Sequence, residues 1–297
     1  MDKVYYFDFG KYYRAWPAIG TCSQLRILNV LKSYCDDNNF LFMPRLTINN
    51  VDYYERFFKR TITWDINNVE YVRIPSYEIP YTEEVAHKYA DRFSQNIKFS
   101  DEFIEKCELV FEELNKPNVG IHIRETDKIE SKYVAFPTCL YENLIKSIDE
   151  NVFISSDCNF SINEFIKYNN VKILNTKRSD DFFPMHRMHH IKSNKNKEIS
   201  ELQQVEELLT EVYIFTKLKK IYYGVFNAVV LNSKLLNPSV ELISMESLLE
   251  DDIKQILNYY SAREKFLWNV IDQEINVGKD IPTTWIAPER TDMSSPI

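Results

Sequence analysis

The chain alternates short apolar runs with longer segments in which apolar residues recur at every third or fourth position. The first pattern is typical of buried strands and the second of amphipathic helices. The runs predict strands at residues 4–9, 40–44, 119–123, 151–157, 171–174, 219–226 and 241–244. The recurring positions predict helices at residues 25–36, 82–94, 101–115, 138–150, 161–169, 201–217 and 246–266. Ser100 is predicted as the N-cap of the third of these helices.

Strands and helices alternate without exception between residues 118 and 174. Such alternation predicts a parallel sheet whose strands are joined by right-handed helical crossovers. The sequence Lys116-Pro117-Asn118 breaks the preceding helix, and we place a domain boundary there. We therefore expect an α/β protein with one domain at residues 1–116, a second at 117–270 and an irregular C-terminal tail at 271–297.

Composition excludes several classes of protein. The net charge of −8 argues against a general nucleic-acid-binding protein. The chain has only five glycines and contains neither a Walker sequence nor G-x-G-x-x-G, which argues against a glycine-rich phosphate loop. The five cysteines are widely spaced and form no C-x-x-C, so we expect reduced thiols in the core.

The sequence predicts no membrane span, because no apolar run approaches the roughly 18 residues that a span requires. Its first residues, Met-Asp-Lys-Val-Tyr-Tyr, lack the apolar segment of a signal peptide. We expect a soluble, cytoplasmic protein of bacterial or viral type. The oligomeric state is not indicated.

The segment with the most candidate chemistry is Val-Gly-Ile-His-Ile-Arg-Glu-Thr-Asp-Lys at residues 119–128, a buried strand followed by polar residues. Ligands of open α/β sheets bind beyond the carboxyl ends of strands. Arg124 could bind a diphosphate through two hydrogen bonds and Lys128 as a point charge, while His122 lies on the same strand face as Arg124. The alternative is an ordinary polar strand end with a surface ion pair between Arg124 and Asp127.

This segment closely resembles the His-x-Arg-Arg-Thr-Asp-Lys motif of the α1,6-fucosyltransferases, the core-fucosylating and nodulation group. In that family the His and Arg touch the nucleotide of GDP-fucose and the Arg is essential, so the resemblance implies donor-binding roles for His122, Arg124 and Lys128. One position departs from the motif: Glu125 stands where the family has its second Arg.

Further matches follow in the order of the family. The run at residues 152–157 resembles its Val-Tyr-Leu-Ala-Thr-Asp, which implies that Asp157 binds the guanine or ribose, against the alternative of a strand-end turn or N-cap. Phe226 lies where the family has a Phe-Ser-Ser turn that contacts phosphate, and Asn227 and Ala228 replace the two serines. The backbone amides of a helix start can still bind an anion. Gly20 resembles, weakly, a glycine before the first helix; a simple capping turn with Thr21 or Ser23 is the alternative.

The resemblance implies a GT-B-like fold, in which two Rossmann-like domains face each other across a cleft, and an inverting, metal-independent transfer of L-fucose from GDP-fucose to a glycan hydroxyl. The family has its base in the loop after the motif, at the position where this chain has Lys132. We favour Glu130, two positions earlier in the same loop, and keep Asp127 as the rival. Two alternatives remain: a related transferase using another nucleotide sugar such as UDP-xylose, and a non-catalytic glycan- or nucleotide-binding protein.

Two other constellations deserve weighing. The aromatic residues of 51–78 could form an acceptor surface, although core packing explains them as well. The run Met-His-Arg-Met-His-His at 185–190 holds three of the five histidines, and we interpret it as a solvated or cleft loop rather than a metal site. No cofactor or metal is expected.

Overall fold

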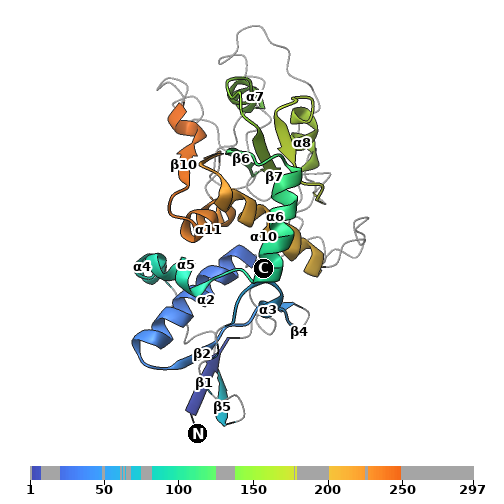
Figure 1. Ribbon diagram of the computed structural model, residues 1–297. Helices are drawn as coiled ribbons and strands as arrows, with labels where there is room; N and C mark the ends of the chain where they lie inside the picture. Colours follow the sequence, from blue (N-terminus) through green and yellow to red (C-terminus); the bar gives the residue numbers. More distant parts are fainter. Residues whose placement is uncertain are drawn as a thin grey trace, which may run out of the picture.

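The computed structural model describes residues 2–7, 21–48, 51–60, 62, 64, 68–74, 82–124, 138–176, 178, 201–224 and 227–248. Within these residues the protein is α/β, with parallel sheets of three and five strands at opposite ends of the molecule and helices between them (Figure 1). The α/β class and the parallel sheet predicted from the sequence are therefore confirmed. The arrangement of two domains across a cleft and the boundary at residue 116 stay predictions.

The smaller sheet has the order β2-β1-β5, in which β1 (Asp2–Tyr6) pairs in parallel with β2 (Leu41–Met43) and β5 (Val69–Arg73). Between β1 and β2 runs α2 (Thr21–Asp37). Two residues after its end, Asn39 adopts the left-handed conformation, which asparagine tolerates better than most residues. A short antiparallel pair, β3 (Thr47–Ile48) and β4 (Val51–Asp52), and helix α3 (Tyr54–Phe57) follow.

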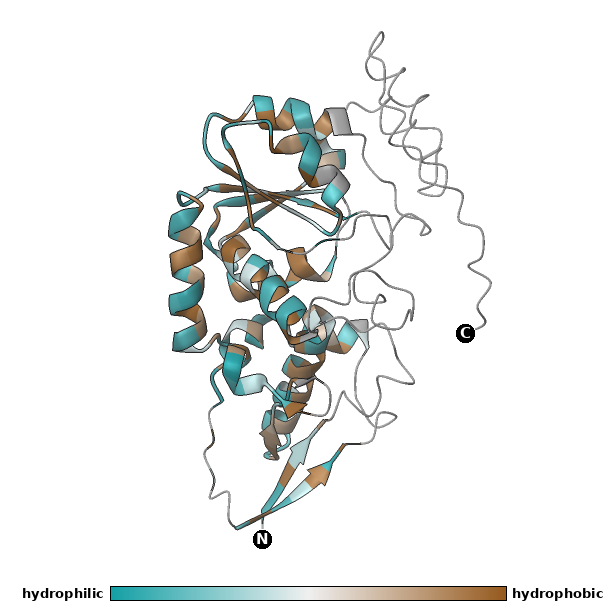
Figure 2. Cartoon of the chain, turned by 90° about the vertical axis from the view of Figure 1, so that its right-hand side faces the viewer, coloured by the Kyte–Doolittle hydropathy of each residue, from teal (hydrophilic) through white to brown (hydrophobic). Residues whose placement is uncertain are grey.

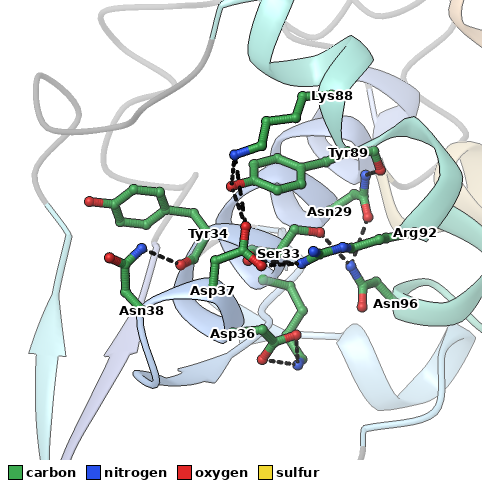
Figure 3. Close-up of polar contacts among 11 residues, drawn as sticks. Asn29, Ser33, Tyr34, Asp36, Asp37, Asn38, Lys88, Tyr89, Arg92 and Asn96 are labelled. Atoms are coloured by element: carbon green, nitrogen blue, oxygen red, sulfur yellow. Dashed lines mark hydrogen bonds and ion pairs between the residues drawn. The ribbon is translucent and has the colours of Figure 1, made fainter.

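The C-terminal end of α2 is tied to three short helices, α4 (Glu83–Lys88), η2 (Ala90–Arg92) and α5 (Phe93–Asn96). Figure 3 shows Asp37 accepting hydrogen bonds from the Tyr89 hydroxyl at 2.9 Å and from Arg92 at 2.7 Å. The backbone of Tyr89 leaves helical geometry, with φ −102° and ψ 8°, so the segment is divided there. The single helix predicted at 82–94 is wrong for this reason.

The larger sheet has the order β10-β9-β6-β7-β8, and all of its pairs are parallel. Its strands are β6 (Val119–Ile123), β7 (Val152–Ser156), β8 (Val171–Ile173), β9 (Lys220–Tyr223) and β10 (Glu241–Ser244). The chain therefore starts in the middle, builds one half outward through β8, and returns to build the other half from β9. Numbered along the chain from β6, the strands stand in the order 3-2-1-4-5, which is the order of a Rossmann-type sheet.

Helices cover both faces of this sheet. One face packs against α7 (Thr138–Lys146) and α8 (Asn159–Phe165). The other packs against α10 (Glu201–Lys217) and α11 (Ala228–Leu236). The approach of β6 to α10 is close, since a Cβ on Gly120 would lie 2.5 Å from Leu218 Cδ1 and 2.7 Å from Phe215 Cε1. A glycine is therefore required there by packing. The last described element is η3 (Met245–Leu248).

One hydrophobic core joins the part of the chain around the smaller sheet to one face of the larger sheet. Buried residues of α2, β2 and α3 belong to the same cluster as residues of α10, β9 and α11. Helix α6 (Asp101–Glu113) packs into it between them, and its N-cap is Ser100, whose Oγ accepts from the Phe103 amide at 3.3 Å, as predicted. In Figure 2 the helices carry hydrophobic and hydrophilic residues in alternation, as helices at the edge of a core do.

The aromatic residues of 51–78 mostly belong to this core. Tyr54, Phe57 and Phe58 are completely or almost completely buried, and Phe58 stacks on Phe99 with ring centroids 5.3 Å apart. Tyr71 is exposed. Core packing is thus confirmed for the first three, whereas an acceptor surface made from them is not.

Candidate functional site

The carboxyl ends of β6 and β9 mark the point where the strand order of the large sheet reverses. Strands on either side of such a point lead their following loops in opposite directions, which opens a crevice for ligands. His122 is the fourth residue of β6 and pairs in register with Tyr223 of β9. Strand β6, which begins the motif segment, therefore ends where sheets of this kind bind their ligands.

His122 is buried with 3% of its surface exposed, and its ring lies 5.8 Å from the ring of Phe215 on α10. Its Nδ1 lies 3.2 Å from the Nδ2 of Asn227. Burial lowers the pKa of His122 to about 4, and the positive charge of Arg124 acts in the same direction, while Asp157 opposes it. His122 is therefore a neutral imidazole at physiological pH.

Arg124 follows β6 directly, and Asp157 follows β7. Their side chains meet with Arg124 Nε 3.1 Å from Asp157 Oδ2, at 22% and 13% side-chain exposure. This contact fixes the direction of the guanidinium at the edge of the sheet. Asp157 is not the N-cap of α8, because Cys158 holds that position. The strand-end ion pair of Arg124 is made with Asp157; Asp127 lies outside the described residues.

Asn227 is the N-cap of α11, which begins beside His122. Its Oδ1 accepts from the amides of Val229 at 2.9 Å and Val230 at 3.4 Å, and its carbonyl accepts from the Leu231 amide at 3.0 Å. The cap thereby satisfies two of the four amides that open a helix, those of Val229 and Val230, while the bond from Leu231 is the first regular bond of the helix. Fewer amides at this helix start can therefore bind an anion than we expected from the sequence.

The N-terminal end of α2 lies against α11. Asn232 Nδ2 donates to the backbone oxygen of Cys22 at 2.8 Å, across 210 positions of sequence. Burial raises the pKa of the Cys22 thiol to about 12, so it is an inert thiol, and Arg124 is near enough to oppose that rise. Thr21 and Ser23, proposed as caps, both lie within α2, which extends further toward the N-terminus than the predicted start at residue 25.

A second buried cluster lies on the α10 face of the sheet and was missed from sequence. Ser155 of β7 donates to Glu211 Oε2 at 2.8 Å, and Arg178 Nη2 lies 3.8 Å from Glu211 Oε1. Arg178 also donates to the backbone oxygens of Ser156 and Leu174. Burial raises the pKa of Glu211 to about 7 despite these partners. The available signal was an acid at position 211 within the apolar stripe of α10.

Several predicted site residues lie outside the described residues: Gly20, Asp127, Lys128, Glu130, Phe226 and the replaced position Glu125, as does the histidine run at 185–190. Among the described residues no group of three or more His, Cys, Asp or Glu could hold a metal ion. Nor does the described part of the chain contain a helix both long and apolar enough to cross a membrane. The four described cysteines, Cys22, Cys35, Cys107 and Cys158, are buried and free, as expected of reduced core thiols.

The structure thus brings together His122, Arg124, Asp157 and Asn227 at one edge of the sheet. The set combines a fixed guanidinium, a carboxylate, an amide and a neutral imidazole. Such a set can bind an anion and a polar heterocycle side by side, which is what a nucleoside diphosphate presents.

No model of a protein family matches the chain, and no curated protein sequence matches it. Solved structures do. The fucosyltransferase NodZ from Bradyrhizobium matches with 12% identity and a TM-score of 0.45 over 80% of this chain and 94% of that one. POFUT1 in complex with GDP matches with 10% identity and a TM-score of 0.45 over 82% of this chain and 97% of that one. The first of these neighbours is a fucosyltransferase.

Proposed function

We propose that the chain is an inverting glycosyltransferase that moves L-fucose from GDP-fucose to a hydroxyl of a glycan acceptor. One observation carries the proposal: the motif that resembles a donor-binding segment ends at the reversal point of a Rossmann-type sheet, with Arg124 oriented there by Asp157. The motif supplies charged side chains suited to a diphosphate, and the carboxyl ends of the strands are where Rossmann-type sheets bind their ligands. The GT-B arrangement, with the acceptor bound on the side of residues 1–116, is part of the proposal.

In the reaction an oxygen of the acceptor attacks the anomeric carbon of fucose from the face opposite the diphosphate. The bond between that carbon and the β-phosphate oxygen breaks, and its electron pair leaves with GDP. The proton of the attacking hydroxyl passes to a carboxylate, for which Glu130 is our candidate and Asp127 the rival. Inversion follows from this single displacement.

The departing diphosphate gains negative charge as the bond breaks, and this charge must be stabilised in place. Arg124 serves this role, with Lys128 as a second positive charge. Asp157 positions Arg124 through the contact to its Nε and binds the guanosine. No metal ion is needed where these side chains neutralise the phosphates.

Binding of nucleotides, measured by calorimetry, tests the donor site. GDP should bind more tightly than UDP, and Arg124→Ala should weaken GDP binding and lower transfer by about 10²- to 10³-fold, the usual loss when one donor to a developing charge is removed. Arg124→Lys should restore little, since an ammonium cannot reproduce a bidentate guanidinium. Arg56→Ala removes an exposed arginine that pairs with Glu206 on α10, and serves as the control.

The outcomes separate the alternatives. A preference for UDP would move the proposal to another nucleotide sugar, which the replacement of the family's two serines by Asn227 and Ala228 permits. Nucleotide binding without transfer to any glycan would favour a binding protein. Full activity of Arg124→Ala would refute the site. Glu130→Gln should lower turnover far more than donor affinity; a loss of affinity alone would place the base elsewhere.

A further inference from the structure

The amide of Asn227 has a fixed orientation. Its Oδ1 faces the amides of Val229 and Val230, at 2.9 and 3.4 Å, and both of these groups are donors. An amide turned by 180° would direct its own N–H hydrogens at them. The helix start therefore determines which end of the Asn227 side chain is oxygen and which is nitrogen.

The other end of the amide faces His122, with Nδ2 3.2 Å from the ring Nδ1. An amide nitrogen can only donate, so Nδ1 must accept. A neutral imidazole carries one hydrogen, which then resides on Nε2. Burial and the charge of Arg124 keep the ring neutral, although Asp157 and a hydrogen bond with the backbone of His122 itself both raise its pKa. Helix capping thus sets the tautomer of a histidine on a neighbouring strand.

We propose that Asn227 is a positioning residue that fixes His122 as the Nε2–H tautomer, so that His122 offers the nucleotide a hydrogen-bond donor. The inference rests on the proposed function and names the kind of ligand atom that His122 selects: an acceptor, either a base carbonyl oxygen or a phosphate oxygen. A serine at this position, as in the family that the motif resembles, would not fix the tautomer, because a hydroxyl both donates and accepts. The replacement at residue 227 therefore adds a constraint on His122.

Two substitutions separate the capping role of Asn227 from its role toward His122. Asn227→Ser and Asn227→Asp both keep an oxygen that caps α11, since serine and aspartate cap helices about as well as asparagine. Serine removes the fixed donor to Nδ1. Aspartate replaces it by an acceptor, which favours a hydrogen on Nδ1. Thermal unfolding and circular dichroism would verify that both variants fold.

The tautomer is read directly by ¹⁵N NMR of protein with labelled histidine, in the absence of nucleotide. The chain has five histidines, and the His122→Gln variant identifies the signal of interest. We expect the Nε2–H tautomer in the native protein across neutral pH, a mixture in Asn227→Ser, and the Nδ1–H or doubly protonated ring in Asn227→Asp. An Nδ1–H tautomer in the native protein, or the same spectrum in all three proteins, would overturn the proposal.

Calorimetry with Asn227→Ser then tests the consequence for binding. If His122 donates to the base, GDP binding should weaken in proportion to the lost Nε2–H fraction, about twofold for an equal mixture of tautomers, while inorganic pyrophosphate is unaffected. If it donates to a phosphate, both should weaken. Unchanged binding of both ligands, together with an altered tautomer, would overturn the selecting role. Because the tautomer is measured without ligand, failure of the native protein to bind GDP would count against the proposed function and leave the tautomer result standing.

Discussion

The pKa of Glu211 leads to a prediction in which removing a charge stabilises the protein. Glu211 is buried on α10, and its carboxyl pKa is raised from 4.5 to about 7 because burial outweighs the attraction of Arg178 and the hydrogen bond from Ser155. The folded protein therefore holds this proton up to about pH 7, whereas the unfolded chain releases it near pH 4.5. The folded state is favoured at low pH, and this contribution to stability is lost as the pH rises from 4.5 to 7.

The magnitude follows from the two pKa values. At about 1.4 kcal/mol for each pH unit, the full effect on the free energy of unfolding is about 3 kcal/mol. Between about pH 5 and pH 8 the expected change is roughly 2.5 kcal/mol, since the unfolded carboxyl is already partly ionised at the lower pH. Gln is close in shape to protonated Glu and cannot ionise. Glu211→Gln should therefore exceed the stability of the native protein by roughly 1 kcal/mol near pH 5 and by roughly 3 kcal/mol near pH 8.

Urea unfolding at the two pH values, followed by fluorescence, measures this difference directly. Glu207→Gln, one turn earlier on α10 and half-buried, is the control for losing a carboxylate from this helix. A stability difference between native protein and Glu211→Gln that stays constant from pH 5 to pH 8 would refute the reasoning. So would a variant that is the less stable protein at pH 8, because that would mean that Arg178 and Ser155 stabilise the ionised carboxylate by more than its burial destabilises it.

Three further predictions concern other parts of the molecule. Gly120→Ala should destabilise the fold by about 1–3 kcal/mol in urea unfolding, because its Cβ would overlap Phe215 and Leu218; a neutral effect would mean that α10 can move away from β6. Ser100→Ala should cost about 1 kcal/mol through loss of the α6 cap while GDP affinity measured by calorimetry stays the same; altered affinity would contradict the purely structural role. EDTA should leave glycosyl transfer unchanged in an activity assay, and loss of activity would reveal a required metal ion.

The sequence predicted the elements whose patterns are decided locally. Strand β6 and helix α10 were located to the residue because an apolar run ends in polar residues in one case and a long apolar stripe repeats in the other. Ser100 was predicted as a cap for the same kind of reason. By contrast, the hydrogen bond from Asn232 to the backbone oxygen of Cys22 joins residues that are 210 positions apart, and no local pattern indicates it.

The candidate site divides in the same way. Arg124 and Asp157 were each predicted from short motifs, but their contact follows from the parallel pairing of β6 and β7, which only the fold supplies. Glu211 was readable as an acid on an apolar helix face. No sequence pattern indicated that Arg178 is buried, because its partners are mainly backbone oxygens.

The hydrophobic core that joins the smaller sheet and its helices to one face of the larger sheet limits how the protein can move. Helices α2 and α11 belong to one cluster and are joined by a buried hydrogen bond, so separating them would expose apolar surface and break that bond in water-excluded surroundings. We therefore expect the amides of both helices to exchange with deuterium slowly and together, as one cooperative unit. A hinge opening between the two sheets would be energetically costly. The edge of the larger sheet that carries Arg124 would then keep a constant distance from the smaller sheet.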